Sequence, residues 1–379
     1  MIHAAYIQLL ARIGVAGFVL FACSATAAAE PTFISKQYTR CTACHVSPSG
    51  GGLLSRYGRS LSAQELSLTG KRPVNGDAAA PGGEEDFLFG AFGDALGPVL
   101  LGIELRPSHL RTEVAGQSFT RSLMMNADVI AAVQARGWTL YGQIGRQPVP
   151  SPRLDSYEHW VGYESDGGLG FRAGRFLPAY GVRFADHTAY NRRHLGFAQY
   201  DQVYGVELSR SSARSLAQVT LSPGLADSFG EGGGSPAFNT TARYQLDLGP
   251  TTALAVSGLF RNGSATDPRQ GAAGVAVGFA PVNRVSVWTQ GDILGVEGSG
   301  EAAFVFVNET AVEAVRGLWL KVSPQLRTEA GVQPRLLRWA FSATFLPRTH
   351  WNINTTVYRD RAAGGPAART WLLQFHVYL

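Results

Sequence analysis

The sequence has little charge, few cysteines and no long apolar run beyond its start. Of the 379 residues, 16% are charged, whereas soluble domains usually carry about 25%. After the first thirty residues, no uninterrupted apolar stretch reaches the length of about 18 residues that a spanning helix needs. This excludes a multi-helix membrane protein. The 45 glycines disfavour a helical bundle, and the 45% hydrophobic content argues against a disordered chain. A glycine- and aromatic-rich β protein remains, either soluble or membrane-embedded.

Lysine is also scarce, because arginine supplies thirty of the 33 basic residues, and these arginines are scattered along the chain. A nucleic-acid-binding protein would carry a Lys/Arg run or patch, so no nucleic-acid partner is expected. The sequence also lacks Ser-His-Asp, zinc and phosphate-loop patterns. Glu158 and His159 stand without the second histidine of a metalloprotease helix. Hydrolytic activity is therefore disfavoured.

Residues 1–29 have the pattern of a secretory signal peptide. Arg12 precedes an apolar stretch over 13–22, and small residues over 25–29 offer cleavage sites. We expect cleavage before Glu30; the alternative is an uncleaved anchor helix, for which the apolar run is short. Cys23 resembles a lipoprotein processing site only weakly, because bulky Phe21 lies close before it. Cys23 is therefore expected to leave with the signal peptide, and the mature chain keeps two cysteines.

These two cysteines form the motif Cys41-Thr42-Ala43-Cys44-His45, which is the attachment pattern of a c-type haem. The two thiols add to the two vinyl groups of one haem, and the adjacent imidazole is thereby carried to the iron as the proximal ligand. An exported chain suits this chemistry. Two alternatives are a disulfide and a thioredoxin-like redox pair, and the second lacks its βαβ surroundings. We therefore expect Cys41 and Cys44 to bind one covalent haem c and His45 to ligate its iron.

The region 30–70 is predicted to be a small, partly helical haem-c segment. It is too short for an independent core, so the haem is expected to supply part of one. The glycines over 50–52 are read as a turn or as a plain linker. No histidine or methionine occurs from Val46 to Ser108, so the usual sixth ligand is missing from the segment. The iron is then five-coordinate, or it is ligated by Lys36 or Lys71, or its ligand comes from the rest of the chain.

Residues 71–97 are predicted to be a linker, and residues 98–379 an all-β, transmembrane antiparallel barrel. The second region consists of segments of about ten residues in which apolar and polar residues alternate, which indicates half-buried strands. Fourteen to eighteen strands fit this pattern, and about sixteen fit best. The predicted strands begin near residues 98, 122, 138, 158, 169, 201, 215, 237, 252, 270, 285, 301, 317, 335, 351 and 369.

Connections after even-numbered segments are short, and the long ones, 148–157, 179–200 and 225–236, follow odd-numbered segments. This alternation is typical of an outer-membrane barrel with short periplasmic turns; a soluble β-sandwich, the alternative, does not require it. The seven tryptophans fall near predicted strand starts, where interfacial girdles are expected. The alternating apolar stripe that ends at Leu379 resembles the final strand of outer-membrane barrels, although those usually end in phenylalanine.

Several barrel residues are candidates for the sixth ligand. If Phe375 faces lipid, His376 faces the lumen near the periplasmic end, so we favour His376, with His350 next. Met124 is expected to face the lumen near the outer rim. His187 and His194 lie in the long connection 179–200, which is expected to fold inward and narrow the pore.

A haem-c segment ahead of an outer-membrane barrel resembles the fused monohaem cytochrome–porins, including the outer-membrane iron-oxidising cytochromes. The match rests on the haem motif and on the downstream Leu54 and Tyr57-Gly58-Arg59. The resemblance implies that Cys41 and Cys44 hold haem c, that His45 ligates it, and that electrons cross the outer membrane. The implied partners are a periplasmic c-type cytochrome or other periplasmic redox protein, an extracellular donor or acceptor such as iron, and outer-membrane lipid. Fe(II) oxidase activity is one form of this function.

Two other functions fit the sequence. One is a diffusion porin that the haem segment caps or gates. The other is a soluble periplasmic cytochrome with a β binding domain. The direction of electron flow stays open.

Overall fold

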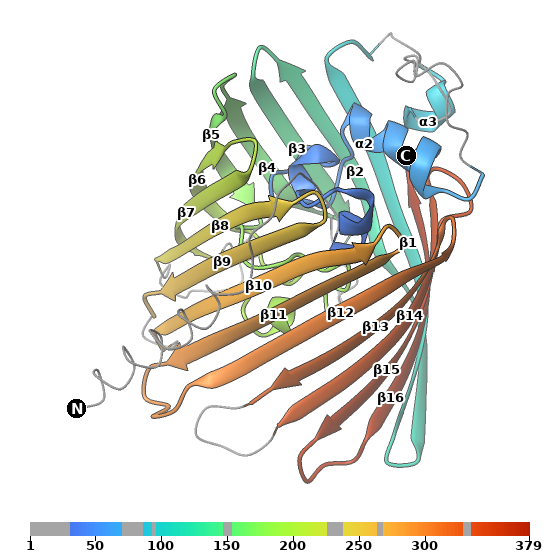
Figure 1. Ribbon diagram of the computed structural model, residues 1–379, viewed down its shortest axis with the longest axis vertical. Coiled ribbons are helices and arrows are strands. Elements are labelled where there is room, and N and C mark those ends of the chain that lie inside the picture. Colours follow the sequence, from blue (N-terminus) through green and yellow to red (C-terminus); the bar gives the residue numbers. More distant parts are fainter. Residues whose placement is uncertain are drawn as a thin grey trace.

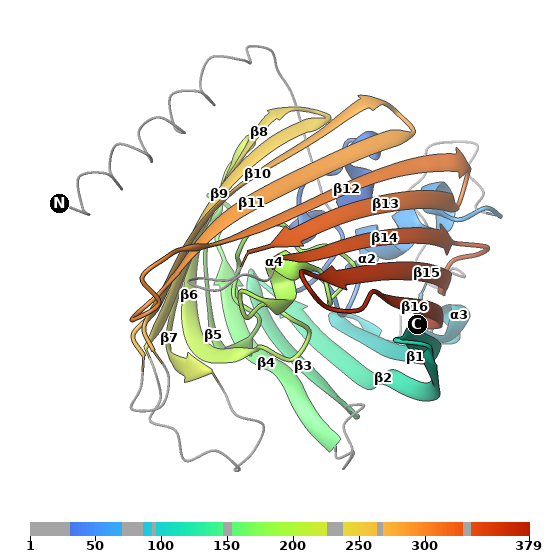
Figure 2. The same cartoon turned by 90° about the horizontal axis from the view of Figure 1, so that it is seen from below.

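The computed structural model describes residues 31–69, 86–92, 96–146, 154–225, 238–263, 268–328 and 335–379. Within these ranges, sixteen strands form a closed barrel in which each strand pairs with its neighbours in sequence and β1 pairs antiparallel with β16 (Figures 1 and 2). The predicted signal peptide and most of the predicted linker, Lys71 included, lie outside the described residues. The predicted all-β barrel of about sixteen strands is confirmed.

The strands agree closely with the alternation of the sequence. The largest difference is at β2, which begins at Gln117 rather than near residue 122. The strands are β1 (Val99–Val114), β2 (Gln117–Ala135), β3 (Trp138–Arg146), β4 (Leu154–Glu164), β5 (Leu169–Phe176), β6 (Val203–Ser211), β7 (Ser215–Leu225), β8 (Asn239–Gly249), β9 (Thr252–Arg261), β10 (Gln270–Val282), β11 (Val285–Val296), β12 (Ala303–Val315), β13 (Leu318–Arg327), β14 (Leu336–Phe345), β15 (Trp351–Ala362) and β16 (Ala368–Tyr378).

Connections after even-numbered strands are short and the long connections follow odd-numbered strands, as predicted, although the turn from β1 to β2, Ala115-Gly116, is short as well. The turn from β2 to β3 is Arg136-Gly137, whose φ angles of 53° and 82° give a tight hairpin of the kind that favours glycine at its second position. The connection from β5 to β6 runs from residue 177 to residue 202. Short turns therefore gather at one end of the barrel, which corresponds to the periplasmic end.

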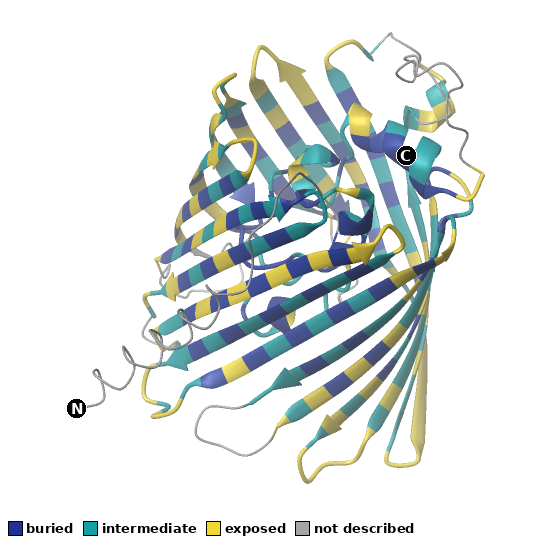
Figure 3. Cartoon of the chain, in the orientation of Figure 1, coloured by how far each residue is buried: buried dark blue, intermediate teal, exposed yellow. Residues whose placement is uncertain are grey.

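Burial alternates along the strands, and Figure 3 shows it as bands of exposed and buried residues. On β10, Val275, Val277 and Phe279 point outward and are exposed, whereas Ala272 and Ala276 are buried. Polar side chains such as those of Glu207, Gln245 and Gln290 are buried on the inner face. A closed wall satisfies its own backbone hydrogen bonds, and its apolar exterior suits lipid. The chain is therefore an outer-membrane barrel, as predicted, and not a soluble β-sandwich.

The tryptophans are divided between the two faces of the wall, so the girdle prediction agrees with three of them and is wrong for three others. Trp138, Trp339 and Trp351 are exposed on the outside. Trp160, Trp288 and Trp319 are at most 4% exposed and face inward. The inward tryptophans pack against chain segments that enter the lumen. The alternation along a single strand does not reveal such segments.

The N-terminal segment, residues 31–69, lies inside the barrel (Figures 1 and 2). It consists of short helical turns: η1 (Pro31–Lys36), η2 (Cys41–Ala43), α2 (Arg56–Leu61) and η3 (Ser62–Leu66). Two further turns are α3 (Phe87–Gly90), within the predicted linker, and α4 (Tyr190–Arg193), within the connection after β5. Among the described residues, no helix is long and apolar enough to cross a membrane.

Candidate functional site around Cys41, Cys44 and His45

Buried polar contacts seat the N-terminal segment against the barrel wall. Arg40 forms an ion pair with Asp247, and Lys36 forms one with Glu313. Trp288 Nε1 donates a hydrogen bond to the carbonyl oxygen of Pro31 at 2.9 Å. These wall residues lie near the short-turn ends of β8, β12 and β11. The segment therefore occupies the periplasmic end of the lumen.

The opposite part of the wall holds the segment as well. Arg59 donates to the carbonyl oxygen of Leu101 near the start of β1, and the hydroxyl oxygens of Ser62 and Tyr378 are 2.7 Å apart. Strands around the circumference of the barrel thus contact the segment, so it is held inside the lumen from several sides. We use "the plug" below for residues 31–69.

The backbone around the haem motif is fixed by local hydrogen bonds. The amide of His45 donates to the carbonyl of Cys41 at 3.0 Å, and the amide of Ser55 donates to that of Cys44 at 2.8 Å. Ser55 also caps α2 by accepting from the amide of Gly58 at 3.1 Å. The two thiols are not joined in a disulfide. The motif therefore begins with a tight turn and is closed by the cap of the following helix.

The glycines after the motif have a structural role, so they are more than a linker. Gly50, Gly51 and Gly52 have φ angles of 78°, 71° and 58°, in the left-handed region that favours glycine. A Cβ on Gly50 would also lie 2.9 Å from Cys41 Cβ. In α2, a Cβ on Gly58 would collide with the carbonyl oxygen of Cys44. Glycine thus allows the chain to fold back closely over the motif.

A cavity of about 310 Å³ adjoins the motif and is lined by Cys41, Cys44 and His45. His45 Nδ1 is buried and makes no hydrogen bond to any described residue. Burial, followed by the positive charge of Arg183, lowers the pKa of His45 to about 4. The ring is therefore neutral at physiological pH, which is the form that ligates a metal.

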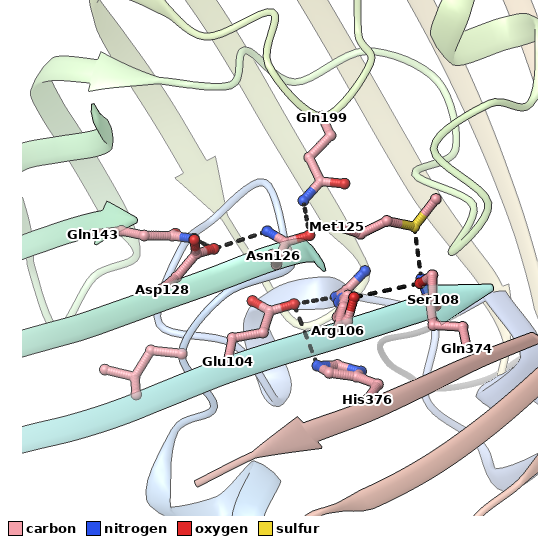
Figure 4. Close-up of polar contacts among 12 residues, drawn as sticks. Glu104, Arg106, Ser108, Met125, Asn126, Asp128, Gln143, Gln199, Gln374 and His376 are labelled. Atoms are coloured by element: carbon pink, nitrogen blue, oxygen red, sulfur yellow. Dashed lines mark hydrogen bonds and ion pairs between the residues drawn. The ribbon is translucent and has the colours of Figure 1, made fainter. Parts of the chain in front are cut away.

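Two of the candidate distal ligands, His350 and His376, line the same cavity. His350 Nδ1 lies 2.7 Å from the carbonyl oxygen of Tyr378, and the ring is almost fully buried. His376 Nε2 lies 3.3 Å from Glu104 Oε1. Figure 4 shows His376 meeting Glu104, which also pairs with Arg106. The lumenal orientation predicted for His376 is confirmed.

The prediction for Met124 is wrong, because Met124 is 39% exposed and does not line the cavity. The pairing of β1 with β2 shifts between Leu105 and Pro107, and this bulge changes the inward-facing residue. Its neighbour Met125 instead accepts a hydrogen bond from Gln374 at 3.0 Å (Figure 4). Strict alternation failed here because a bulge adds one residue to one strand.

The remaining candidates for the sixth ligand differ in their contacts and in whether they line the cavity. Lys36 pairs with Glu313 and is not among the cavity-lining residues, and Lys71 lies outside the described residues. His194 Nδ1 lies 2.7 Å from Arg327 Nη1, away from the cavity. His187 lines the cavity, and burial lowers its pKa to about 4. The structure therefore brings His187, His350 and His376 to the cavity of the haem motif.

The connection 177–202 folds into the lumen, as predicted; we call it the inward loop. The amide of Val182 donates to Gln290 at 2.7 Å, and the amide of Tyr190 donates to Gln325 at 2.9 Å. Arg338 Nη1 donates to the carbonyl of Thr188 at 3.1 Å. These contacts hold the loop against β11, β13 and β14. The inward loop and the plug together fill much of the lumen.

Polar residues of the wall complete the site. Asp128 accepts hydrogen bonds from Asn126 at 2.8 Å and from Gln143 at 2.9 Å, and Gln199 of the inward loop reaches Asn126 at 2.6 Å (Figure 4). The alternation of polar and apolar residues along the strands accounts for this polar wall. It did not identify Arg183 and Arg192 of the inward loop as cavity residues, because only the path of the loop brings them there.

The fold is similar to that of solved outer-membrane proteins. No family model matches the chain, and no curated protein matches it. Pseudomonas putida OprB has a TM-score of 0.60 and 8% identity, over 76% of this chain and 97% of that chain. The anion-selective porin from Comamonas acidovorans has a TM-score of 0.56 and 8% identity, over 74% and 99%. A loop-deletion mutant of OmpT from Vibrio cholerae gives 0.56 and 10%, over 74% and 99%. At such identities the likeness is one of fold: the chain is a porin-like outer-membrane barrel.

Proposed function

We propose that the protein carries one covalent c-type haem inside its barrel and transfers electrons across the outer membrane. The observation that carries this proposal is the common cavity of Cys41, Cys44 and His45 within the lumen of a closed barrel. Cys41 and Cys44 would hold the haem as thioethers, and His45 would be the proximal ligand. When bound, the haem supplies one-electron oxidation and reduction of its iron.

The residues around the motif fit such a group. The neutral, buried ring of His45 has an Nδ1 that makes no hydrogen bond to a described residue, and both thiols border the same space. Gly50 and Gly58 lack the side chains that would collide with the motif. The plug and the inward loop exclude water from much of the lumen, and the barrel wall excludes lipid. A redox centre held in this way is insulated from both.

For the distal position, His350 and His376 are the candidates, and the contacts favour His350. Its Nδ1 faces the carbonyl oxygen of Tyr378, which can only accept a hydrogen bond. The proton of the neutral ring therefore lies on Nδ1, and the lone pair lies on Nε2. That is the tautomer of a metal ligand. His376 Nε2 instead lies 3.3 Å from Glu104 Oε1, beside a carboxylate that also pairs with Arg106. Substituting each histidine in turn and recording the low-spin absorption bands distinguishes the two.

The periplasmic position of the plug suggests a periplasmic electron partner, either a c-type cytochrome or another periplasmic redox protein. The partner on the other side is an extracellular donor or acceptor, with Fe(II) as the candidate donor implied by the resemblance to the fused cytochrome–porins. Fe(II) oxidation would then be the reaction at the outer face.

Proteoliposomes that contain a trapped redox dye test this function. The purified full chain is inserted, and ferrous iron or dithionite is added outside. We expect dye reduction that is lost in Cys41→Ser/Cys44→Ser, with the haem measured separately by its pyridine haemochrome spectrum. Thr42→Ser is the matched control, since it changes a residue of the same motif but neither thiol nor the imidazole. Haem-loaded, inserted protein that reduces no dye would refute electron transfer with these donors.

A second function, a diffusion porin that the plug caps or gates, is favoured by the porin-like fold. Single-channel recordings of the full chain test it. A gated porin shows stable open states with solute flux, and this flux persists in Cys41→Ser/Cys44→Ser. A redox conduit shows low conductance and haem-dependent dye reduction.

A further inference from the structure

A cluster of three arginines lies where the plug meets the inward loop. Arg183 and Arg192 belong to the loop and Arg243 to β8. All three line a second cavity of about 40 Å³ next to Cys41, and Arg183 and Arg192 also line the large cavity. A cavity needs a volume of about 10–15 Å³ to hold one water, so the small cavity has room for more than one water-sized group.

The hydrogen-bond partners of this cluster are uncharged. Arg183 Nη1 donates to the carbonyl oxygens of Ser49, at 3.1 Å, and Gly50. Arg192 donates to the carbonyls of Phe184, at 2.7 Å, and Phe197, at 3.1 Å.

Arg243 donates to the carbonyl of Gly181 at 2.8 Å and to the amide oxygen of Gln245 at 2.5 Å. Among the described residues, none of the three arginines forms an ion pair with a carboxylate. Three positive charges therefore meet without a carboxylate in contact.

Other buried arginines of the same barrel are neutralised directly. Arg40 pairs with Asp247, Arg172 with Glu207, and Arg338 with Asp360. Asp186 and Asp201 act on Arg192 electrostatically without an ion-pair contact, and Asp247 and Glu207, which pair with Arg40 and Arg172, act on Arg243 in the same way. Asp186 Oδ1 accepts from the amide and hydroxyl of Thr188, and Asp201 Oδ2 accepts from the amide of Ala198. One oxygen of each of these two carboxylates is thus engaged elsewhere, and neither carboxylate forms an ion pair with Arg192 among the described residues.

The electrostatic effect on Arg192 is in keeping with an uncompensated cluster. Its side chain is buried, and burial together with repulsion from Arg183 lowers the pKa of Arg192 to about 9. The lining of the large cavity includes five cationic side chains and two acidic side chains, Glu104 and Glu158. Two of the cations are compensated, because Arg106 pairs with Glu104 and Lys321 pairs with Glu309, whereas Arg183 and Arg192 have no such partner among the described residues. Buried like charges are costly unless a counter-charge is present.

From this geometry we propose that Arg183, Arg192 and Arg243 form an oxyanion-binding site for a carboxylate- or phosphate-type group. Guanidinium groups donate in a planar fork that matches the oxygens of such anions. The anion comes either from solution or from a carboxylate of a haem attached in the adjoining cavity. In both cases binding joins the inward loop, the plug and the wall, so occupancy stabilises the closed arrangement of the lumen.

Hydrogen exchange of the purified full chain, with inorganic phosphate as the probe, tests the site. In haem-free Cys41→Ser/Cys44→Ser, phosphate is expected to slow exchange of amides in the inward loop by the factor 1 + [phosphate]/Kd. Arg183→Gln and Arg192→Gln are expected to abolish this dependence, and Arg183→Lys to keep part of it. Arg193→Gln is the matched control, because Arg193 is the exposed neighbour in the same loop.

The haem-loaded protein distinguishes the two sources. If phosphate slows exchange there as well, the ligand is a soluble anion. If the loop of the loaded protein is already protected, does not respond to phosphate, and loses its protection in Arg183→Gln, the ligand is a haem carboxylate. Exchange that is unaffected by phosphate in the haem-free protein, and equal in Arg183→Gln, Arg192→Gln and Arg193→Gln, overturns the proposal. Neither outcome depends on electron transfer, so this site and the proposed function fail separately.

Discussion

The ion pair of Arg40 with Asp247 attaches the plug to β8, and breaking it is a direct test of how the plug is held. Asp247 is 1% exposed and accepts from Arg40 Nε and from Thr39 Oγ1, each at 2.6 Å. Asp247→Ala leaves a buried guanidinium without its carboxylate, which costs about 3–5 kcal/mol. The equilibrium constant for release of residues 39–44 then rises roughly 10²- to 4 × 10³-fold.

Hydrogen exchange measured by mass spectrometry gives this quantity, because amides of residues 39–44 exchange in proportion to the population of the released state. We expect exchange to accelerate there by the same factor, while strands far from the plug keep their rates. Glu297→Gln is the control. Its pair with Arg269 spans 3.9 Å at an exposed position, and such pairs contribute about 0–1 kcal/mol.

A double variant separates loss of the pair from loss of a side chain. Arg40→Met/Asp247→Leu removes both charges and keeps apolar volume, so it is expected to recover most of the protection. If Asp247→Ala leaves the exchange of residues 39–44 unchanged, or if the double variant is as loose as the single one, the ion pair does not hold the plug and the reasoning is refuted.

Three further predictions concern the plug and the inward loop. Gly58→Ala places a Cβ against the carbonyl oxygen of Cys44 and is expected to destabilise the plug by about 1–3 kcal/mol and to lower the haem content. Gly271→Ala is expected to be tolerated, because the nearest atom to its Cβ is 3.9 Å away. Thermal melts measure the stability of the two variants, and haemochrome spectra measure their haem content. Trp319→Ala removes a buried ring that packs edge-to-face on Phe33, with the ring centroids 5.9 Å apart. It is expected to lower the free energy of unfolding by about 3–5 kcal/mol and to make the plug sensitive to protease. Trp339→Ala, on the outer face of the barrel, is expected to leave the plug resistant to protease. The pKa of His187 is lowered to about 4 from its ordinary value of 6.5, so the stability of the folded inward loop is unaffected by this group above pH 6.5 and falls by up to about 3 kcal/mol as the pH drops towards 4. Amide exchange in the inward loop should therefore accelerate over that pH range, and His187→Gln should flatten the response.

The strands could be predicted because the wall of a barrel imposes its pattern on each segment separately. Every strand has one face towards lipid and one towards the lumen, so residues alternate with period two whatever the neighbouring strand contains. The lumenal position of His376 followed from this rule, and so did the polar wall at Glu104 and Asp128. The short turns followed from hairpin chemistry, as at Arg136-Gly137.

The errors occurred where a contact depends on a second segment. Met124 and Met125 exchanged faces because the pairing of β1 with β2 contains a bulge, which is a property of two strands. Trp288 and Trp319 face inward because η1 covers them, with Trp288 bonded to Pro31 and Trp319 packed on Phe33. Neither feature leaves a signal in the strand's own sequence. The arginine cluster was missed for the same reason, since Arg183 and Arg243 are sixty residues apart in the chain.

The plug draws its apolar core from the barrel, and this determines which experiments are informative. Ile34 is fully buried in a cluster with residues of the inward loop and of β9 to β12, and Leu53 is buried in a cluster with Leu100 and Tyr141. Leu61 and Leu66 pack with Leu346 of the turn after β14. A segment this short cannot bury enough surface alone. Deleting it would therefore expose apolar residues of the lumen as well as remove the haem motif, and an altered conductance would not separate a gate from an insulating filler. Substitutions at Cys41 and Cys44 keep the plug in the lumen, so they test the haem without removing the apolar filling.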